Sequence, residues 1–195
     1  YEKIDSSKGQ IRLLRIQKQH LFWGHLRCSI EIARPENASQ CEALSYRWKF
    51  GSDGADIKFR RIFIDDETME IPQSAWELLH ARSSLYTERL VWLDAVCIDQ
   101  KNTSEKAGQI PLMGQIYTKA TQVIVWPGDR FDSGMASTMV LRLFVTNYQF
   151  EAEEEEFRSI LEHETGRMGW KAMVNLFENP YFTRIWCVQE VALGE

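Results

Sequence analysis

The stretch that decides the fold is Leu90-Val91-Trp92-Leu93-Asp94-Ala95-Val96-Cys97-Ile98, which is apolar at every position except Asp94. An apolar run of this length is typical of a strand that is covered on both faces, as in a parallel sheet. A buried carboxylate must be paired or hydrogen-bonded. Asp94 is therefore either a structural hydrogen-bond acceptor or a group that takes part in chemistry.

Strands and helices alternate on both sides of this stretch. Upstream, the sequence predicts a strand over residues 42–48, a hairpin over 60–71 around Asp66-Glu67, and a helix that Pro72 opens and that continues to about residue 84. Downstream, it predicts a helix over 104–120 capped by Ser104, with Ile110 on its apolar side, and a strand over 122–126. This alternation predicts an α/β domain with a central, mostly parallel sheet and flanking helices.

The two ends of the chain extend this core differently. Residues 11–16 and 26–32 have strand character and predict an N-terminal antiparallel pair, and loops follow at 34–40 and 49–56. From residue 133 the pattern is helical, with helices expected over 134–147, 153–164 and 170–177 and a last helix after Asn179-Pro180. We expect one domain over 1–195, made of a strand pair and loop (1–40), an α/β core (41–130) and a helical extension (131–195).

Composition narrows the class of protein. Apolar residues make up 44% of the 195 residues and the net charge is −5, with an acidic run at 151–156, which argues against a nucleic-acid ligand. No apolar run approaches the roughly 20 residues of a membrane span.

The four cysteines form no CxxC pair and the histidines are not interleaved at metal-ligand spacing. We expect reduced thiols, a cytoplasmic location and no metal site. The chain begins at Tyr1 without Met and stops at Glu195, just past the motif at residues 184–190, so we also expect a domain excised from a longer protein.

Polar side chains gather where the predicted parallel strands end, which is where open α/β sheets bind ligands. Ser45-Tyr46-Arg47-Trp48 ends one strand and Asp99-Gln100 follows the next. Arg47 suits phosphate recognition and Trp48 suits stacking on a ring. Each of these residues has a structural alternative. Tyr46 and Trp48 are equally consistent with positions in the hydrophobic core, and Asp99 is equally consistent with a helix cap. Cys97 has no evident histidine to activate it as a nucleophile.

The last helix carries a second polar group. Thr183 is a plausible cap, and Trp186 and Glu190 stand four residues apart, so they share one helix face. Glu190 could fold back to the edge where the strands end. The alternative is a half-buried tryptophan beside a solvated glutamate.

These motifs resemble the heterokaryon incompatibility (HET) domain of filamentous fungi. The resemblance covers nearly the whole chain in order, and one departure is Lys49-Phe50, which separates Trp48 from Gly51. It rests on Ile11-Arg12-Leu13-Leu14, residues 43–48 (ALSYRW), residues 91–100 (VWLDAVCIDQ), Glu105-Lys106, Gln109, Met113, Ile116-Tyr117, Ala120, residues 123–126 and residues 184–190 (RIWCVQE). The resemblance implies a domain that triggers growth arrest and programmed cell death when genetically different fungal cells fuse, a form of allorecognition and innate immunity.

A second resemblance is to Toll/interleukin-1 receptor (TIR) domains. Leu44-Ser45-Tyr46-Arg47 is similar to their first-strand motif in plants, and residues 186–190 (WCVQE) are similar to their Trp-Cys-x-x-Glu. This resemblance implies a flavodoxin-like fold and, in NAD-cleaving members, a catalytic glutamate. Carried over, Glu190 is the catalytic residue and Trp186 shapes the pocket. We expect the residues near the strand ends to bind NAD, which would be a substrate and not a cofactor: Ser45, Tyr46, Arg47, Trp48, Asp94 and Asp99.

Three functions remain open. The first is hydrolysis of the nicotinamide–ribose bond of NAD. The second is a non-catalytic signalling module that associates with itself or with other signalling domains. The third is a metal-dependent phosphohydrolase that uses Asp94 and Asp99.

Overall fold

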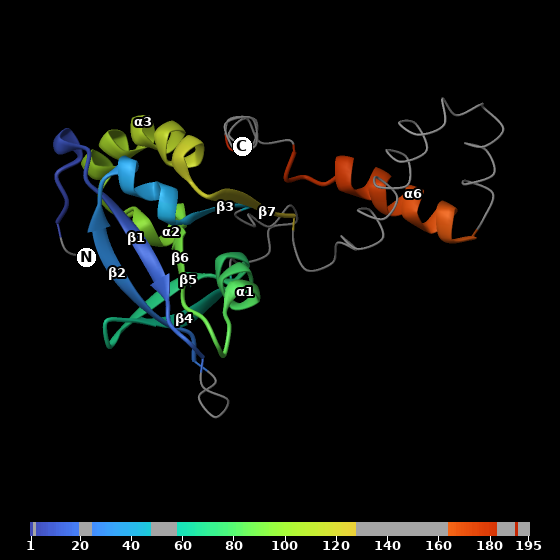
Figure 1. The fold of residues 1–195 in the computed structure, drawn as a ribbon, viewed down its shortest axis with the longest axis horizontal. Coiled ribbons are helices and arrows are strands. Elements are labelled where there is room, and N and C mark those ends of the chain that lie inside the picture. Colours follow the sequence, from blue (N-terminus) through green and yellow to red (C-terminus); the bar gives the residue numbers. More distant parts are fainter. Residues whose placement is uncertain (2, 20–24, 48–57, 128–163, 183–189, 191–195) are drawn as a thin grey trace. The chain divides into compact units, whose positions relative to one another are not determined.

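The computed structural model describes residues 1, 3–19, 25–47, 58–127, 164–182 and 190 (Figure 1). The chain divides into two compact units. The first combines Tyr1–Trp126 with Arg184–Glu195, and the second is Pro127–Thr183. The predicted helix over 134–147, the predicted helix over 153–164 up to its last residue, the loop at 49–56 and the cap at Thr183 lie outside the described residues.

The first unit is built on a mixed sheet whose seven described strands run in the order β5-β4-β2-β1-β6-β3-β7 (Figure 1). Their bounds are β1 Ile11–Ile16, β2 Arg27–Ala33, β3 Glu42–Tyr46, β4 Phe59–Ile64, β5 Glu67–Pro72, β6 Arg89–Trp92 and β7 Gln122–Trp126. The predicted α/β class is confirmed. The prediction of a mostly parallel sheet is wrong for the sheet as a whole, because β1 pairs antiparallel with both β2 and β6, and β4 pairs antiparallel with β5. Parallel pairing holds for β6, β3 and β7, and for β2 with β4.

Two antiparallel predictions are confirmed. The N-terminal pair aligns Ile11 with Ala33 and Ile16 with Cys28. The hairpin of β4 and β5 turns at Asp65 and Asp66, one residue earlier than predicted. Both aspartates have positive φ angles, of 48° and 69°. Aspartate is one of the few non-glycine residues that adopt this region at low cost, so the turn position follows from residue type.

The apolar stretch 90–98 is not one strand, and this prediction is wrong. Strand β6 ends at Trp92, and α2 (Asp94–Cys97) follows as a single helical turn. The carboxylate of Asp94 accepts a hydrogen bond from the backbone N–H of Ala95 at 2.7 Å. The N–H groups of Val96 and Cys97 donate to the carbonyl of Leu93. A helical turn therefore satisfies the backbone of this stretch, and hydrophobicity alone does not distinguish such a turn from a strand.

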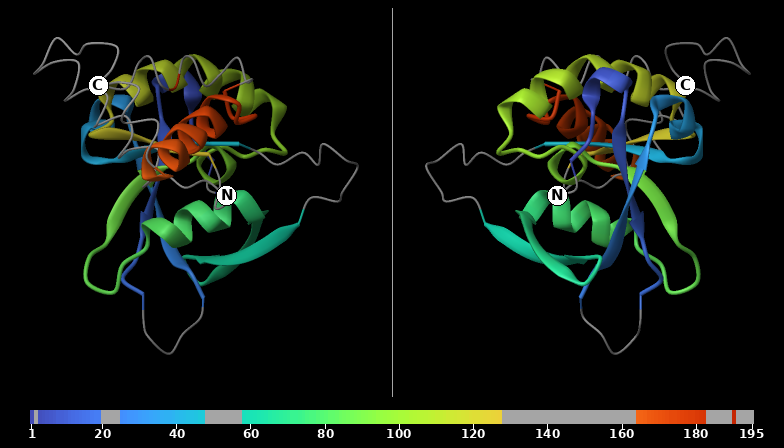
Figure 2. Two further views of the ribbon diagram at one scale, coloured as in Figure 1. Left: turned by 90° about the vertical axis from the view of Figure 1, so that its right-hand side faces the viewer. Right: turned by 90° about the vertical axis from the view of Figure 1, so that its left-hand side faces the viewer.

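The two longer helices of this unit lie close to their predicted positions. Helix α1 (Gln73–Arg82) follows Pro72 and packs against β4 and β5. Helix α3 (Thr103–Lys119) packs beside two 3-10 helices, η1 (Ser6–Lys8) and η2 (Pro35–Gln40), the second of which replaces the predicted loop (Figure 2). Its N-cap is Asn102 and not Ser104, because the Asn102 side chain accepts the Glu105 N–H. On the predicted apolar side Ile110 is 42% exposed, whereas Ile116 and Tyr117 are buried, as is Gln109.

One hydrophobic cluster joins these elements. It includes Leu13, Leu44, Leu78 and Trp92, with Trp92 packed edge-on against Tyr117. No helix in the part of the chain that the structure describes is long and apolar enough to cross a membrane.

The second unit contains α6 (Glu164–Phe177), which begins earlier than the predicted residue 170 and ends where predicted. A turn follows it, in which the Asn179 side chain accepts the Tyr181 N–H at 2.9 Å and donates to the Pro127 carbonyl.

Candidate functional site

The carboxyl ends of three parallel strands meet at one edge of the sheet. In β3, Ser45 aligns with Val125 of β7 and Tyr46 with Trp126. Ala43 aligns with Trp92, the last residue of β6, and Asp94 follows two residues further on. Arg47 directly follows β3. The edge that the sequence predicted as a ligand site therefore exists, and it is built from segments 45–47, 94 and 125–126.

At this edge the structure brings Ser45 and Glu190 together. The hydroxyl of Ser45 donates a hydrogen bond to Oε2 of Glu190, across 145 positions of sequence. Both side chains are buried, with exposed fractions of 1% for Ser45 and 4% for Glu190. The alternative of a solvated Glu190 is therefore wrong. Ser45 and Glu190 belong to two separate sequence motifs, and in the fold they share one buried contact.

The other predicted site residues are placed differently. Tyr46 is part of the hydrophobic core, and Arg47 is half-buried beyond the end of β3. Asp94 is half-buried as the first residue of α2, so the prediction that it lies inside a strand is wrong; Gln100 donates to its backbone carbonyl at 2.7 Å. Trp48 and Trp186 lie outside the described residues.

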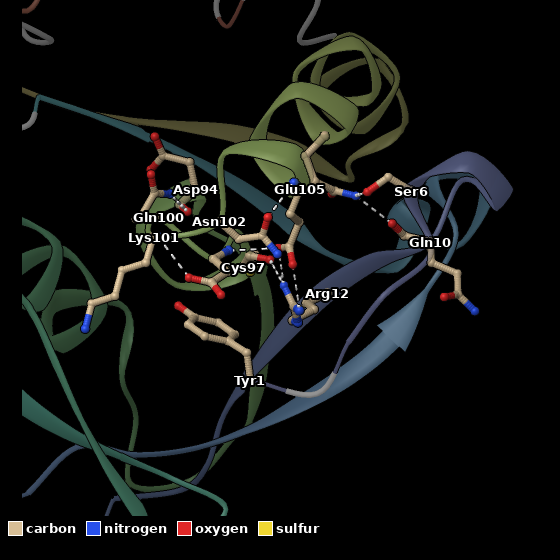
Figure 3. Close-up of polar contacts among 12 residues, drawn as sticks. Tyr1, Ser6, Gln10, Arg12, Asp94, Cys97, Gln100, Lys101, Asn102 and Glu105 are labelled. Atoms are coloured by element: carbon tan, nitrogen blue, oxygen red, sulfur yellow. Dashed lines mark hydrogen bonds and ion pairs between the residues drawn. The ribbon is translucent and has the colours of Figure 1, made fainter.

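Asp99 lies in a separate cluster, next to the buried ion pair of Arg12 and Glu105 that Figure 3 shows. Its carboxylate accepts the Lys101 N–H at 3.0 Å and its own N–H donates to Glu105 at 2.8 Å. Asp99 therefore shapes the turn between α2 and α3, and the cap of α3 is Asn102. The alternative that Asp99 caps the helix is wrong.

Sequence analysis missed the centre of this cluster, which is Arg12. Its guanidinium contacts both oxygens of Glu105, at 2.5 Å and 3.1 Å, and donates to the Cys97 carbonyl at 3.1 Å (Figure 3). Arg12 is 1% exposed although it is charged. Burial tends to raise the pKa of Glu105, but the hydrogen bonds from Arg12 and from the Asp99 N–H outweigh burial and lower it. Arg12 is one of two arginines in the apolar strand 11–16 and belongs to the Ile11-Arg12-Leu13-Leu14 motif, but neither pattern indicates a buried ion pair.

A second carboxylate cluster lies at the amino end of β3. Glu42 accepts hydrogen bonds from Arg82 at 2.7 Å and 3.0 Å, from Arg89 at 2.9 Å and from Gln122 at 3.1 Å. Burial tends to raise the pKa of Glu42, but Arg82 first, then Arg89 and Gln122, lower it. This cluster links α1, β6 and β7 to the amino end of β3, which is opposite the end that carries Ser45.

Cys97 does not have the properties of a nucleophile. It is fully buried, and burial raises the pKa of its thiol to about 12. Its sulfur accepts the Leu93 N–H at 3.5 Å. Among the described residues, no group of three or more His, Cys, Asp and Glu side chains could hold a metal ion.

These features define an α/β domain with a buried serine–carboxylate contact where its parallel strands end. Residues 41–190 match the model of the heterokaryon incompatibility protein (HET) family, so the chain belongs to that family. A curated relative is heterokaryon incompatibility protein 6, OR allele, of Neurospora crassa, which is 27% identical over 97% of this chain. The chain spans about a third (33%) of the length of that relative. No significant match was found among solved structures.

Proposed function

We propose that this domain triggers cell death in fungal heterokaryon incompatibility by cleaving the nicotinamide–ribose bond of NAD, with Glu190 as the catalytic residue. Membership of the HET family and the incompatibility relative support the biological role. The buried contact between Glu190 and Ser45, at the edge where α/β sheets bind ligands, is the observation that supports the chemistry. The resemblance of residues 186–190 to the TIR glutamate motif supports the substrate.

The proposed reaction breaks the bond between ribose C1′ and the nicotinamide nitrogen. Nicotinamide leaves as a neutral molecule with the bonding electrons, and water adds its oxygen to C1′ and releases a proton. Positive charge develops on the ribose in the transition state. The carboxylate of Glu190 stabilises that charge or holds the ribose hydroxyls, and Arg47 binds the pyrophosphate.

The test is nicotinamide release from NAD by the purified domain at high protein concentration. Glu190→Gln changes a carboxylate to an amide of nearly equal size. We expect it to lower turnover by about 100-fold or more, because removing a transition-state charge partner has effects of this order. Turnover retained by Glu190→Gln would contradict the assignment of Glu190 as the catalytic residue.

Glu70→Gln is the matched control, since it makes the same chemical change at an exposed position of β5. We expect wild-type turnover from this variant. Circular dichroism and melting of both variants would separate loss of catalysis from loss of fold. Equal losses in the two variants would contradict a role specific to Glu190.

The non-catalytic alternative is favoured by one observation. Strand β7 (QVIVW) ends the sheet order of the described strands and is rich in apolar residues. End strands of this kind can add a strand from another chain. If wild-type protein releases no nicotinamide even when it is forced to oligomerise, and if Glu190→Gln still kills cells, assembly is the function.

A further inference from the structure

We propose that Ser45 is a positioning residue that fixes the carboxylate of Glu190 and does not itself contact substrate. This inference rests on the proposed function for its chemistry. It replaces the sequence-based assignment of Ser45 to substrate binding. The reason is the contact itself, because the Ser45 hydroxyl donates to Oε2 of Glu190 and both side chains are buried, at 1% and 4% exposed.

The place of Ser45 in the sheet suits this role. Strand β3 pairs with β6 on one side and with β7 on the other, so its backbone is held on both edges. The Glu42 cluster anchors the other end of the same strand. A hydroxyl on such a strand has little freedom to move, and catalytic groups act best when a rigid neighbour holds them.

The contact also divides the roles of the two carboxylate oxygens. Among the described residues, the hydrogen bond to Glu190 engages Oε2. We assign Oε1 to the ribose of the substrate. Without the Ser45 hydroxyl, the carboxylate would rotate about its terminal torsion, which has a broad energy minimum, and Oε1 would lose its orientation.

The test compares Ser45→Ala with Ser45→Thr in NAD turnover. A shift of about 1 Å in a catalytic group can cost on the order of 100-fold in rate. We expect Ser45→Ala to lower kcat by about 10- to 100-fold with KM changed less than about 3-fold, since only the transition-state interaction is lost. Ser45→Thr keeps the hydroxyl, and we expect it to recover most of kcat.

Ser74→Ala is the matched control. Ser74 is also a buried serine, in α1, and its hydroxyl has no hydrogen-bond partner among the described residues. We expect wild-type kcat and KM. A raised KM with unchanged kcat in Ser45→Ala would overturn the inference and return Ser45 to substrate binding. Wild-type kinetics in Ser45→Ala would also overturn it.

A double-mutant cycle separates this inference from the proposed function. Melting temperatures would be measured for Ser45→Ala, Glu190→Ala and the double variant. Residues in contact show coupled effects, so the double variant should melt at least about 2 °C higher than the sum of the single shifts predicts. Additive shifts would overturn the contact itself. Coupled shifts in a protein that releases no nicotinamide would refute NAD cleavage while the Ser45–Glu190 contact stands.

Discussion

Arg12 shows how much a buried charge depends on the carboxylate it is paired with. Its guanidinium and the Glu105 carboxylate are both nearly inaccessible, at 1% and 7% exposure. A buried charge without a partner is strongly destabilising, although an intact buried pair adds little net stability. The pair therefore acts as a constraint that joins β1 to the beginning of α3, and the turn at Asp99 depends on it.

Arg12→Met removes the cation and leaves the carboxylate buried. We expect a loss of about 3–5 kcal/mol in the free energy of unfolding, measured by urea denaturation at pH 7. The double variant Arg12→Met with Glu105→Gln removes both charges and keeps an acceptor for the Asp99 N–H, so most of the loss should be recovered.

Arg61→Met is the control, since Arg61 pairs with Glu70 on the surface, where both side chains are more than half exposed. We expect a change below about 1 kcal/mol. A similar loss in Arg12→Met and Arg61→Met would show that the Arg12–Glu105 pair is not buried in solution.

Helix α3 shows which features of an element the sequence could predict. The spacing of its apolar residues predicts its length. The alternation of strands and helices along the chain predicts the strands that precede and follow it. Its cap could not be assigned, because Asn102, Thr103 and Ser104 are all good cap residues and only the Asn102–Glu105 contact distinguishes them. Burial of Gln109 was also not foreseeable, since it depends on donation to Ser6 and to the Gln10 carbonyl.

Close packing of α3 against η1 predicts the effect of Gly108→Ala. In an exposed helix this change stabilises by roughly 0.5–1 kcal/mol. Here the new Cβ would lie 2.6 Å from Cβ of Ser6, which is closer than packed atoms allow. We expect a net destabilisation of about 1–3 kcal/mol, seen as a lower melting temperature.

Ser6→Gly removes the opposing Cβ. Combined with Gly108→Ala, it should restore part of the lost stability relative to Gly108→Ala alone. If Gly108→Ala raises the melting temperature, η1 does not pack on α3 as the structure has it.

For the whole molecule, two clustered carboxylates set the response to acid. The folded-state pKa values of Glu42 and Glu105 are lowered from the ordinary value of 4.5. Their contribution to stability is therefore complete above the pKa of the unfolded chain and is lost as pH falls through the lower folded values. We expect these two groups to change the urea concentration at the unfolding midpoint little between pH 7 and about pH 5. Below about pH 4.5 we expect that midpoint concentration to decrease.

Glu42→Gln tests the source of this acid response. The variant should be less stable at pH 7, because Arg82 and Arg89 lose their anion, and its stability should fall less steeply below pH 4.5. A slope equal to that of the wild type would assign the acid response to other carboxylates.

The sequence was most informative where local pattern and residue type act alone. The first strand pair, the hairpin, α1, α3 and β7 were predictable because their periodicity or turn residues are specific. The mixed sheet was not, since β1 inserts between β2 and β6 through pairings that no local pattern encodes. Ser45 and Glu190 were identified by motif, but their burial and mutual contact required the fold.

Chain order within the first unit has an evolutionary consequence. The chain leaves this unit after Trp126 and returns at Arg184, so Pro127–Thr183 is an insertion between the two halves of one site. The entropy cost of closing a longer loop grows slowly, by about 0.6 kcal/mol for each doubling of its length. Family members are therefore expected to vary in the length and sequence of this insertion while the spacing from Ser45 to Trp126 stays constrained. Such variation would leave β3 and Ser45 unchanged.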